Sequence, residues 1–117
     1  MRRTGALVAL VLLVAGCGQP QQVSKQAEEV QSVAAEGALL AHEVAEDGSL
    51  STFRRAHSRA LRERLGQLQP AIRDAQLARI AARVSRELER LGGDEPSGAS
   101  SERRLERDAD AAAELAK

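Results

Sequence analysis

Apolar and small residues recur along the first half of the chain in alternating steps of four and three. This spacing places side chains on one face of an α-helix. The pattern runs over 22–46 and comprises Val23, Ala27, Val30, Ala34, Gly37, Ala41 and Val44, widened by Val33 and Leu40. Gly37 is flanked by alanines, which would let a second helix approach closely. We therefore predict a helix with one buried face.

The same spacing predicts two further helices, over 50–69 and from Ile72 to Leu91. Pro70 separates them, because proline lacks the backbone N–H and clashes with the preceding turn. Gly92-Gly93 ends the later helix as a C-cap. The expected buried faces are Leu50, Phe53, Ala56, Ala60, Leu61, Leu65 and Leu68 in the earlier helix, and Ile72, Leu77, Ile80, Ala81, Val84, Leu88 and Leu91 in the later one.

The C-terminal part is different in composition. Residues 92–101 include Gly, Pro and Ser and predict a flexible linker. A last helix is expected over 102–117, with Ser101 as its N-cap. Its apolar face is sparse and consists of Leu105, Ala109, Ala112 and Leu115. We expect this helix to form but to dock weakly.

Large apolar residues are scarce in the chain. After removal of residues 1–16, Leu, Val, Ile and Phe make up 19 of 101 residues, just under the share of about 20% below which disorder competes with folding. We predict an all-α fold, namely a small antiparallel bundle of about three helices over 22–91. A core this thin makes oligomerisation or partner binding attractive, since further burial would complete the fold.

Charge divides the chain into blocks. Residues 20–49 carry a net charge of −5, residues 50–91 carry +6 with ten arginines, and residues 94–117 carry −3. We therefore expect the acidic first helix to pack against the arginine-rich helices.

A turn at Asp47-Gly48-Ser49 joins the first two helices, with Ser49 as N-cap of the second. Glu43 and Glu46 precede this turn, and Arg54 and Arg55 follow it. Each pair opposes the dipole of its own helix. Ion pairing across the turn would compensate both.

The N-terminus has the layout of an export signal: a basic start at Met1-Arg2-Arg3, an apolar run over 6–14, and small residues before Cys17. The run is far shorter than the roughly 20 residues of a membrane-spanning helix. A twin-arginine signal is disfavoured, because the consensus around Arg2-Arg3 is missing.

Leu13-Val14-Ala15-Gly16-Cys17 resembles the lipobox of bacterial lipoproteins. The resemblance implies a signal peptide over 1–16, a lipid on the Cys17 thiol and a tether over 17–21. It also implies attachment to the extracytoplasmic side of the cell membrane or outer membrane. Cys17 is the only cysteine, so a disulfide within the chain is excluded. The alternative, a buried structural cysteine, is disfavoured because Cys17 lies outside every amphipathic pattern.

Composition argues against several functions. The chain has one Phe and no Trp or Tyr, so it lacks the aromatic platforms on which single-stranded nucleic acids stack. Glycine-rich phosphate loops and zinc motifs are absent from the sequence. The serines cluster at caps and turns, and so few large side chains seldom build an apolar pocket. We expect no enzymatic activity, no cofactor, no small-molecule substrate and no nucleic-acid partner.

Two groups of polar residues remain as candidate sites. His42 and His57 flank the turn, and with Glu46 they suggest a metal site, but nothing in the sequence fixes a fourth ligand. The second group is two arginine rows: Arg55, Arg59 and Arg62 in the second helix, and Arg79, Arg83, Arg86 and Arg90 in the third. These rows would meet anionic headgroups, wall polymers or an acidic partner. Balanced overall charge favours the simpler interpretation, in which they pair with the first helix and with water.

The sequence thus predicts a non-catalytic, lipid-anchored envelope protein that acts as a helical interaction or adaptor module. Its partner would be another protein or a second copy, bound at a partly exposed apolar face near Leu77, Ile80, Val84 and Leu88. The alternative is a structural lipoprotein of the cell wall, tethered to peptidoglycan through Lys117. The small helical lipoprotein of enteric outer membranes is similar in ending with such a lysine. That family has one uninterrupted heptad helix, whereas this chain has breaks.

Overall fold

The computed structural model describes the backbone of residues 2–46 and 50–117, and side chains from Gln21 onward outside 47–49. These residues form four α-helices and no strand: α1 (Arg2–Ala45), α2 (Ser51–Leu68), α3 (Ala75–Leu91) and α4 (Gly98–Ala116), with a 3-10 turn η1 (Gln69–Ala71) after α2. The predicted all-α class is confirmed. The side chain of Cys17 and the expected turn at 47–49 lie outside the described residues.

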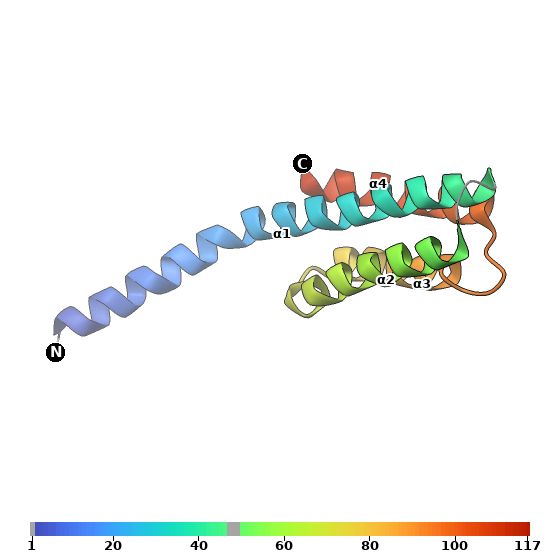
Figure 1. Ribbon diagram of the computed structural model, residues 1–117. Helices are drawn as coiled ribbons and strands as arrows, with labels where there is room; N and C mark the ends of the chain where they lie inside the picture. Colours follow the sequence, from blue (N-terminus) through green and yellow to red (C-terminus); the bar gives the residue numbers. More distant parts are fainter. Residues whose placement is uncertain (1, 47–49) are drawn as a thin grey trace.

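Helix α4 lies along α1 and runs in the opposite direction, while α2 and α3 form a second pair beside them (Figure 1). At one end of the α1–α4 pair the Ser24 hydroxyl donates to the Ala116 carbonyl at 2.6 Å. At the other end His42 lies 3.1 Å from Glu102. In its described part, no helix is long and apolar enough to cross a membrane.

The expected weak docking of the last helix is not confirmed. Leu105 and Ala112 are completely buried, and Gly98, Ser101 and Asp108 are buried with them. The helix begins at Gly98 rather than at Glu102, so the expected linker over 92–101 is partly helical. The bundle therefore has four packed helices among the described residues rather than about three with a loose appendage.

Small residues explain how a sparse apolar face docks so closely. A Cβ atom added to Gly98 would lie 2.6 Å from the Ala45 amide nitrogen and 2.7 Å from the Ala41 carbonyl oxygen, so the two backbones touch. One added to Gly37 would lie 2.8 Å from Leu88 and 3.2 Å from Leu105. The close approach predicted at Gly37 therefore occurs, with α3 and α4 as the neighbours.

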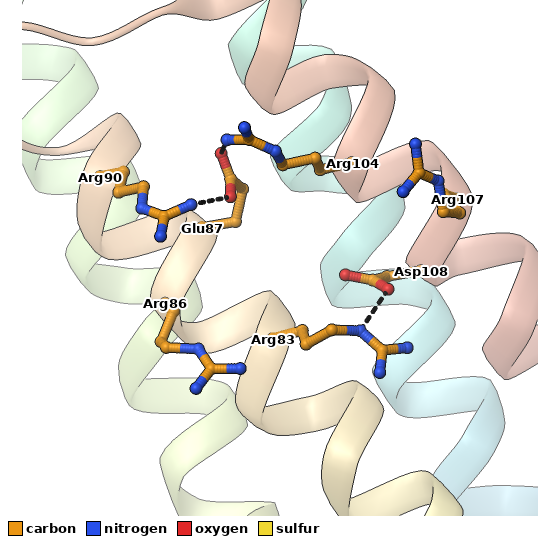
Figure 2. Close-up of a pocket in the computed structure, with 7 residues that line it drawn as sticks. All are labelled: Arg83, Arg86, Glu87, Arg90, Arg104, Arg107 and Asp108. Atoms are coloured by element: carbon orange, nitrogen blue, oxygen red, sulfur yellow. Dashed lines mark hydrogen bonds and ion pairs between the residues drawn. The ribbon is translucent and has the colours of Figure 1, made fainter.

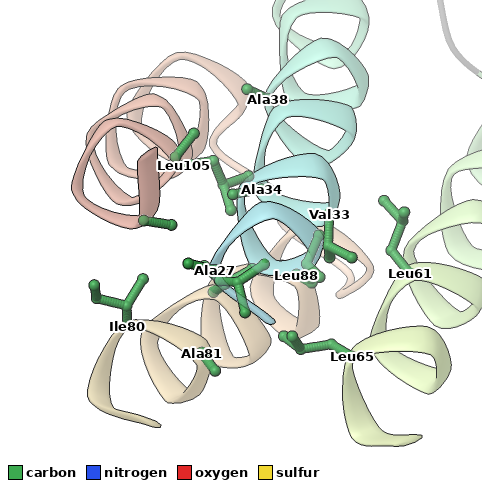
Figure 3. Close-up of a cluster of buried hydrophobic side chains, with 14 of the residues drawn as sticks. Ala27, Val33, Ala34, Ala38, Leu61, Leu65, Ile80, Ala81, Leu88 and Leu105 are labelled. Atoms are coloured by element: carbon green, nitrogen blue, oxygen red, sulfur yellow. The ribbon is translucent and has the colours of Figure 1, made fainter. Parts of the chain in front are cut away.

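The core lies where all four helices meet (Figure 3). The predicted faces of α1 and α3 are confirmed for their central residues, including Val30, Val33 and Leu40. One prediction is wrong: Leu77, Ile80, Val84 and Leu88 are at most 2% exposed and form no partly uncovered face. They are core because α1 and α4 cover the side of α3 that α2 leaves open.

The predicted face of α2 is wrong in its first half. Leu50 is 79% and Phe53 52% exposed, and α2 instead buries Arg54, Ser58, Leu61 and Leu65. Hydrogen bonding by polar side chains explains this burial. Ser58 Oγ donates to the Leu88 carbonyl at 2.5 Å. This bond reaches a carbonyl in the last turn of α3, which also accepts from the Gly92 amide at 3.0 Å.

Arg54 reaches the same end of α3. Its Nη1 donates to the carbonyls of Leu91 at 2.5 Å and Gly93 at 2.7 Å. The guanidinium therefore sits at the negative end of the α3 dipole, where a cation is favourable. Arg54 thus caps α3 from a neighbouring helix, and Ser58 adds a second donor to the Leu88 carbonyl.

The ion pairs expected across the turn are also wrong. Arg54 bonds the carbonyls just described, Arg55 pairs with Asp94 at 2.9 Å, and Glu46 lies 3.1 Å from His42. Glu43 takes part in no ion pair within the described part of the chain.

The acidic first helix does pair with an arginine-rich one, but at mid-helix. Arg64 of α2 donates to Glu29 at 3.2 Å, to Glu36 at 3.1 Å and to Ser32 at 3.2 Å, all on α1. The hydrogen bond to Glu29, assisted by Glu36, raises the pKa of Arg64 above its ordinary value. The guanidinium group of Arg64 is therefore charged at every pH at which the chain is folded.

Local signals place α3 after the break at Pro70. Pro70 lies in η1, and Asp74 caps α3 by accepting from the Leu77 amide at 2.9 Å. Gln26 of α1 donates to the Ala71 carbonyl at 3.0 Å and fixes η1 against the bundle. The reorientation at Pro70 turns the arginine row of α3 toward α4.

Candidate functional site: an arginine groove between α3 and α4

A groove of about 510 Å³ runs between α3 and α4 and is lined by charged side chains (Figure 2). We call it the arginine groove and define it by Arg83, Arg86, Glu87, Arg90, Arg104, Arg107 and Asp108. Its five guanidinium groups and two carboxylates give a net charge of +3. It carries more positive charge than the grooves lined by Leu39, by Arg59 or by Arg73.

Helical spacing produces the groove. On α3, Arg83, Arg86, Glu87 and Arg90 follow one another by three, one and three residues and form one stripe. Residues three and four apart share a helix face. The matching stripe on α4 is Arg104, Arg107 and Asp108. Packing of α3 against α4 brings the two stripes together.

Glu87 organises one end of the groove. It is only 4% exposed, and it accepts hydrogen bonds from Ser101 Oγ at 2.8 Å, Arg90 at 3.1 Å and Arg104 at 3.3 Å. A buried carboxylate requires such partners, because desolvating an unpaired charge is costly. Glu87 therefore joins α3 to α4 and orients two arginines.

Asp108 does the same at the other end. It is 5% exposed, and its Oδ1 accepts from Arg83 Nε at 3.0 Å. The two buried acids thus hold Arg83, Arg90 and Arg104. The side chains of these three arginines remain 47%, 63% and 50% exposed.

Arg86 and Arg107 complete the groove without such a partner. Neither makes an ion pair or a side-chain hydrogen bond with any residue that the structure describes. Figure 2 shows them beside the held arginines. Guanidinium groups bind carboxylates and phosphates through paired N–H donors. The arrangement is thus suited to binding an anionic group.

The other predicted arginines take no part in the groove. Arg79 is exposed and lies at the N-terminal end of the α3 row, four residues before Arg83. Arg55 binds Asp94 and lines a shallow surface pocket with Arg59. Arg62 has a buried Nε atom without a partner among the described residues. The row on α2 is therefore separate from that on α3.

The remaining candidate residues lie apart. His42 contacts Glu46 and Glu102, each at 3.1 Å, whereas His57 packs edge-on against Phe53 with ring centroids 5.5 Å apart. No group of three or more His, Cys, Asp or Glu side chains could hold a metal in the part of the chain described. Lys117 is 75% exposed and lies 2.9 Å from Glu114.

A second groove, of about 520 Å³, lies on the other side of α4 against α1. We call it the acidic groove. Its apolar floor is Ala35, Ala38, Leu39 and Ala109, and its rim carries Glu102, Glu106, Asp110, His42 and Gln31. With His42 neutral, its net charge is −3. Leu39 is 68% exposed there, and with Leu50 and Phe53 it is one of three large apolar side chains that are exposed among the described residues.

The sequence held signals for the parts that periodicity alone did not identify. Glu87 falls inside the apolar stripe of α3 beside Leu88, and Asp108 falls beside Ala109 in that of α4. An acid in a buried stripe indicates a paired charge.

Comparisons with protein-family models, with curated proteins and with solved structures found no match for this chain.

Proposed function

We propose that this protein is a non-catalytic, lipid-anchored envelope module that binds an acidic protein segment in the arginine groove. One observation carries the binding role: Arg86 and Arg107 line a +3 groove and have no ion-pair partner among the described residues. The three neighbouring arginines are already held by buried acids, so only Arg86 and Arg107 must be ordered when a ligand binds. The lipid anchor rests on the lipobox-like sequence at Leu13–Cys17.

The position of the groove favours a protein over lipid headgroups. Ala116 lies beside Ser24, so the end of α4 is at the side of the bundle nearer the predicted anchor. Arg107 precedes Ala116 by nine residues, which is about 14 Å along a helix. The groove is thus set back from the anchored end. A protein partner can reach it there, whereas headgroups stay at the bilayer surface.

The test is binding of acidic peptides to the full lipidated chain in detergent micelles. Arg86→Ala with Arg107→Ala should weaken binding of a glutamate-rich peptide by about tenfold or more, because both unpaired guanidinium groups are lost. Stability should be unchanged, since neither side chain makes an ion pair with a described residue.

The matched control is Arg79→Ala with Arg103→Ala, which removes the same charge from exposed positions outside the groove. It should bind the peptide like the parent chain. Equal loss in both double variants would mean that net charge alone attracts the peptide. Unchanged binding in the groove variant would also overturn the proposal.

The second candidate is a peptidoglycan tether through Lys117. Exposure of 75% favours it, because the amine is accessible for coupling. Its place near Ser24, at the side of the predicted anchor, argues against a link that reaches outward. Muramidase digestion of cell walls should release a mass-shifted chain that Lys117→Arg abolishes if the tether exists. A chain entirely free of wall fragments would dispose of it.

A further inference from the structure

We infer that the acidic segment bound by the arginine groove is the acidic groove of a second copy of this chain. This inference rests on the proposed function of the arginine groove. The two surfaces lie on the two sides of α4, one against α3 and the other against α1. They carry net charges of +3 and −3.

The charges that lack internal partners match one another. Arg86 and Arg107 make no ion pair with any described residue, and the same is true of Glu106 and Asp110. Each surface therefore offers two unpaired charges of one sign to the other. Complementary charge of this kind favours the matched encounter and disfavours contact between like surfaces.

The dimensions of the two charged rows also agree. Glu102, Glu106 and Asp110 recur every four residues and form one ridge, about 12 Å long at the rise of an α-helix. Arg83 and Arg90 are seven positions apart, or about 10.5 Å along the helix. The ridge of one α4 can therefore lie along the arginine groove of the next copy with several charges aligned.

Apolar surface supports the same contact. Leu39 stands 68% exposed on a floor of alanines in the acidic groove. The arginine groove offers the methylene stems of its five arginines, and such stems cover apolar surface while their charged ends stay hydrated. In the single chain the Leu39 side chain is exposed to water. Docking of the two grooves would bury it.

Membrane attachment fits this geometry. Because the two surfaces differ, the contact is heterologous and would build rings or rows rather than a twofold dimer. Copies anchored through Cys17 in one membrane all point the same way, and that is what side-by-side contact between unlike faces requires. Anchoring also raises the effective concentration of the copies, so a weak contact suffices.

Charge reversal tests the inference with the full lipidated chain, in enough detergent that most micelles hold at most one chain. We use an acid-reversed variant, Glu106→Arg with Asp110→Arg, and a base-reversed variant, Arg86→Glu with Arg107→Glu. The parent should self-associate in sedimentation runs. Each reversed variant alone should self-associate at least about tenfold more weakly, because like charges then meet in the contact.

Mixing keeps the test decisive. The base-reversed chain retains its acidic groove and the acid-reversed chain retains its arginine groove, so one normal contact is possible between them. A differently tagged mixture should therefore form complexes that contain both tags, at concentrations at which neither variant associates alone. The chain with all four reversals should again self-associate. Circular dichroism establishes that each variant is folded, and the exposed control Arg79→Glu with Arg103→Glu should behave as the parent.

The outcomes separate this inference from the proposed function. A parent chain that stays monomeric while its arginine groove binds the acidic peptide overturns self-recognition and leaves the proposed function standing. Self-association that none of the reversals alters also overturns the inference. A chain that neither self-associates nor binds the peptide removes both.

Discussion

Two polar side chains of α2 decide how that helix sits on the bundle. Arg54 is 6% exposed and Ser58 is fully buried, and both donate to carbonyls at the end of α3. The spacing of apolar residues predicts that Phe53 lies on the buried face of α2, but its side chain is half exposed. At the scale of the residue, hydrogen bonding to helix-end carbonyls outweighs the burial of one aromatic ring.

Arg54→Ala should lower the free energy of unfolding by about 1.5–3 kcal/mol, the range for hydrogen bonds made by a charged donor. The variant leaves the Leu91 and Gly93 carbonyls without this donor. Arg55→Ala is the matched control, since its only pair among the described residues is with the 93% exposed Asp94, and it should change stability by less than about 0.5 kcal/mol. Equal effects of the two changes on urea unfolding would refute the capping role.

At the scale of the element, close packing of the α4 backbone against α1 holds α4 in place more than large side chains do. Gly98 permits backbone contact with α1, and Leu105 fills the space over Gly37. Sparse apolar faces are normally poor docking surfaces, but van der Waals contact improves steeply as the helices approach. Glu87 and Ser101 add a buried hydrogen bond between α3 and α4.

Two glycine substitutions test this account of α4. Gly98→Ala should destabilise the chain by about 1–3 kcal/mol, because the new methyl group would meet the α1 backbone. Gly66→Ala meets nothing within 4 Å in the exposed part of α2 and should stabilise by up to about 1 kcal/mol. Thermal unfolding of both variants gives the comparison, and a neutral or stabilising Gly98→Ala would mean that α4 does not need this contact.

These elements also mark how far sequence reasoning reaches. Helical periodicity identified the buried faces of α1 and α3, because apolar side chains cover them. It assigned the wrong buried face to the first half of α2, where the buried residues are polar, and it undervalued α4, whose docking depends on missing Cβ atoms. For the site, the row from Arg83 to Arg90 was visible as a pattern. Its partners Arg104 and Arg107 were not, since only the packing of α3 on α4 brings them together.

At the scale of the whole molecule, we propose a membrane anchor joined to a charged docking surface. The anchor is testable by itself: Cys17→Ser should leave an unlipidated precursor, because the proposed lipid attaches to the Cys17 thiol. The parent should partition into the detergent phase and the variant into the aqueous phase. Identical masses and identical partitioning would show that the resemblance of Leu13–Cys17 to a lipobox is misleading.

The central claim is that the arginine groove receives an acidic segment, and crosslinking in the cells that make the protein tests it most directly. A photoreactive residue placed at Arg86 should capture a segment rich in Asp and Glu, and by our inference the peptide around Glu106 of another copy. The same probe at Arg79, outside the groove, should not capture that segment. No crosslink from position 86, or identical products from both positions, would contradict the account.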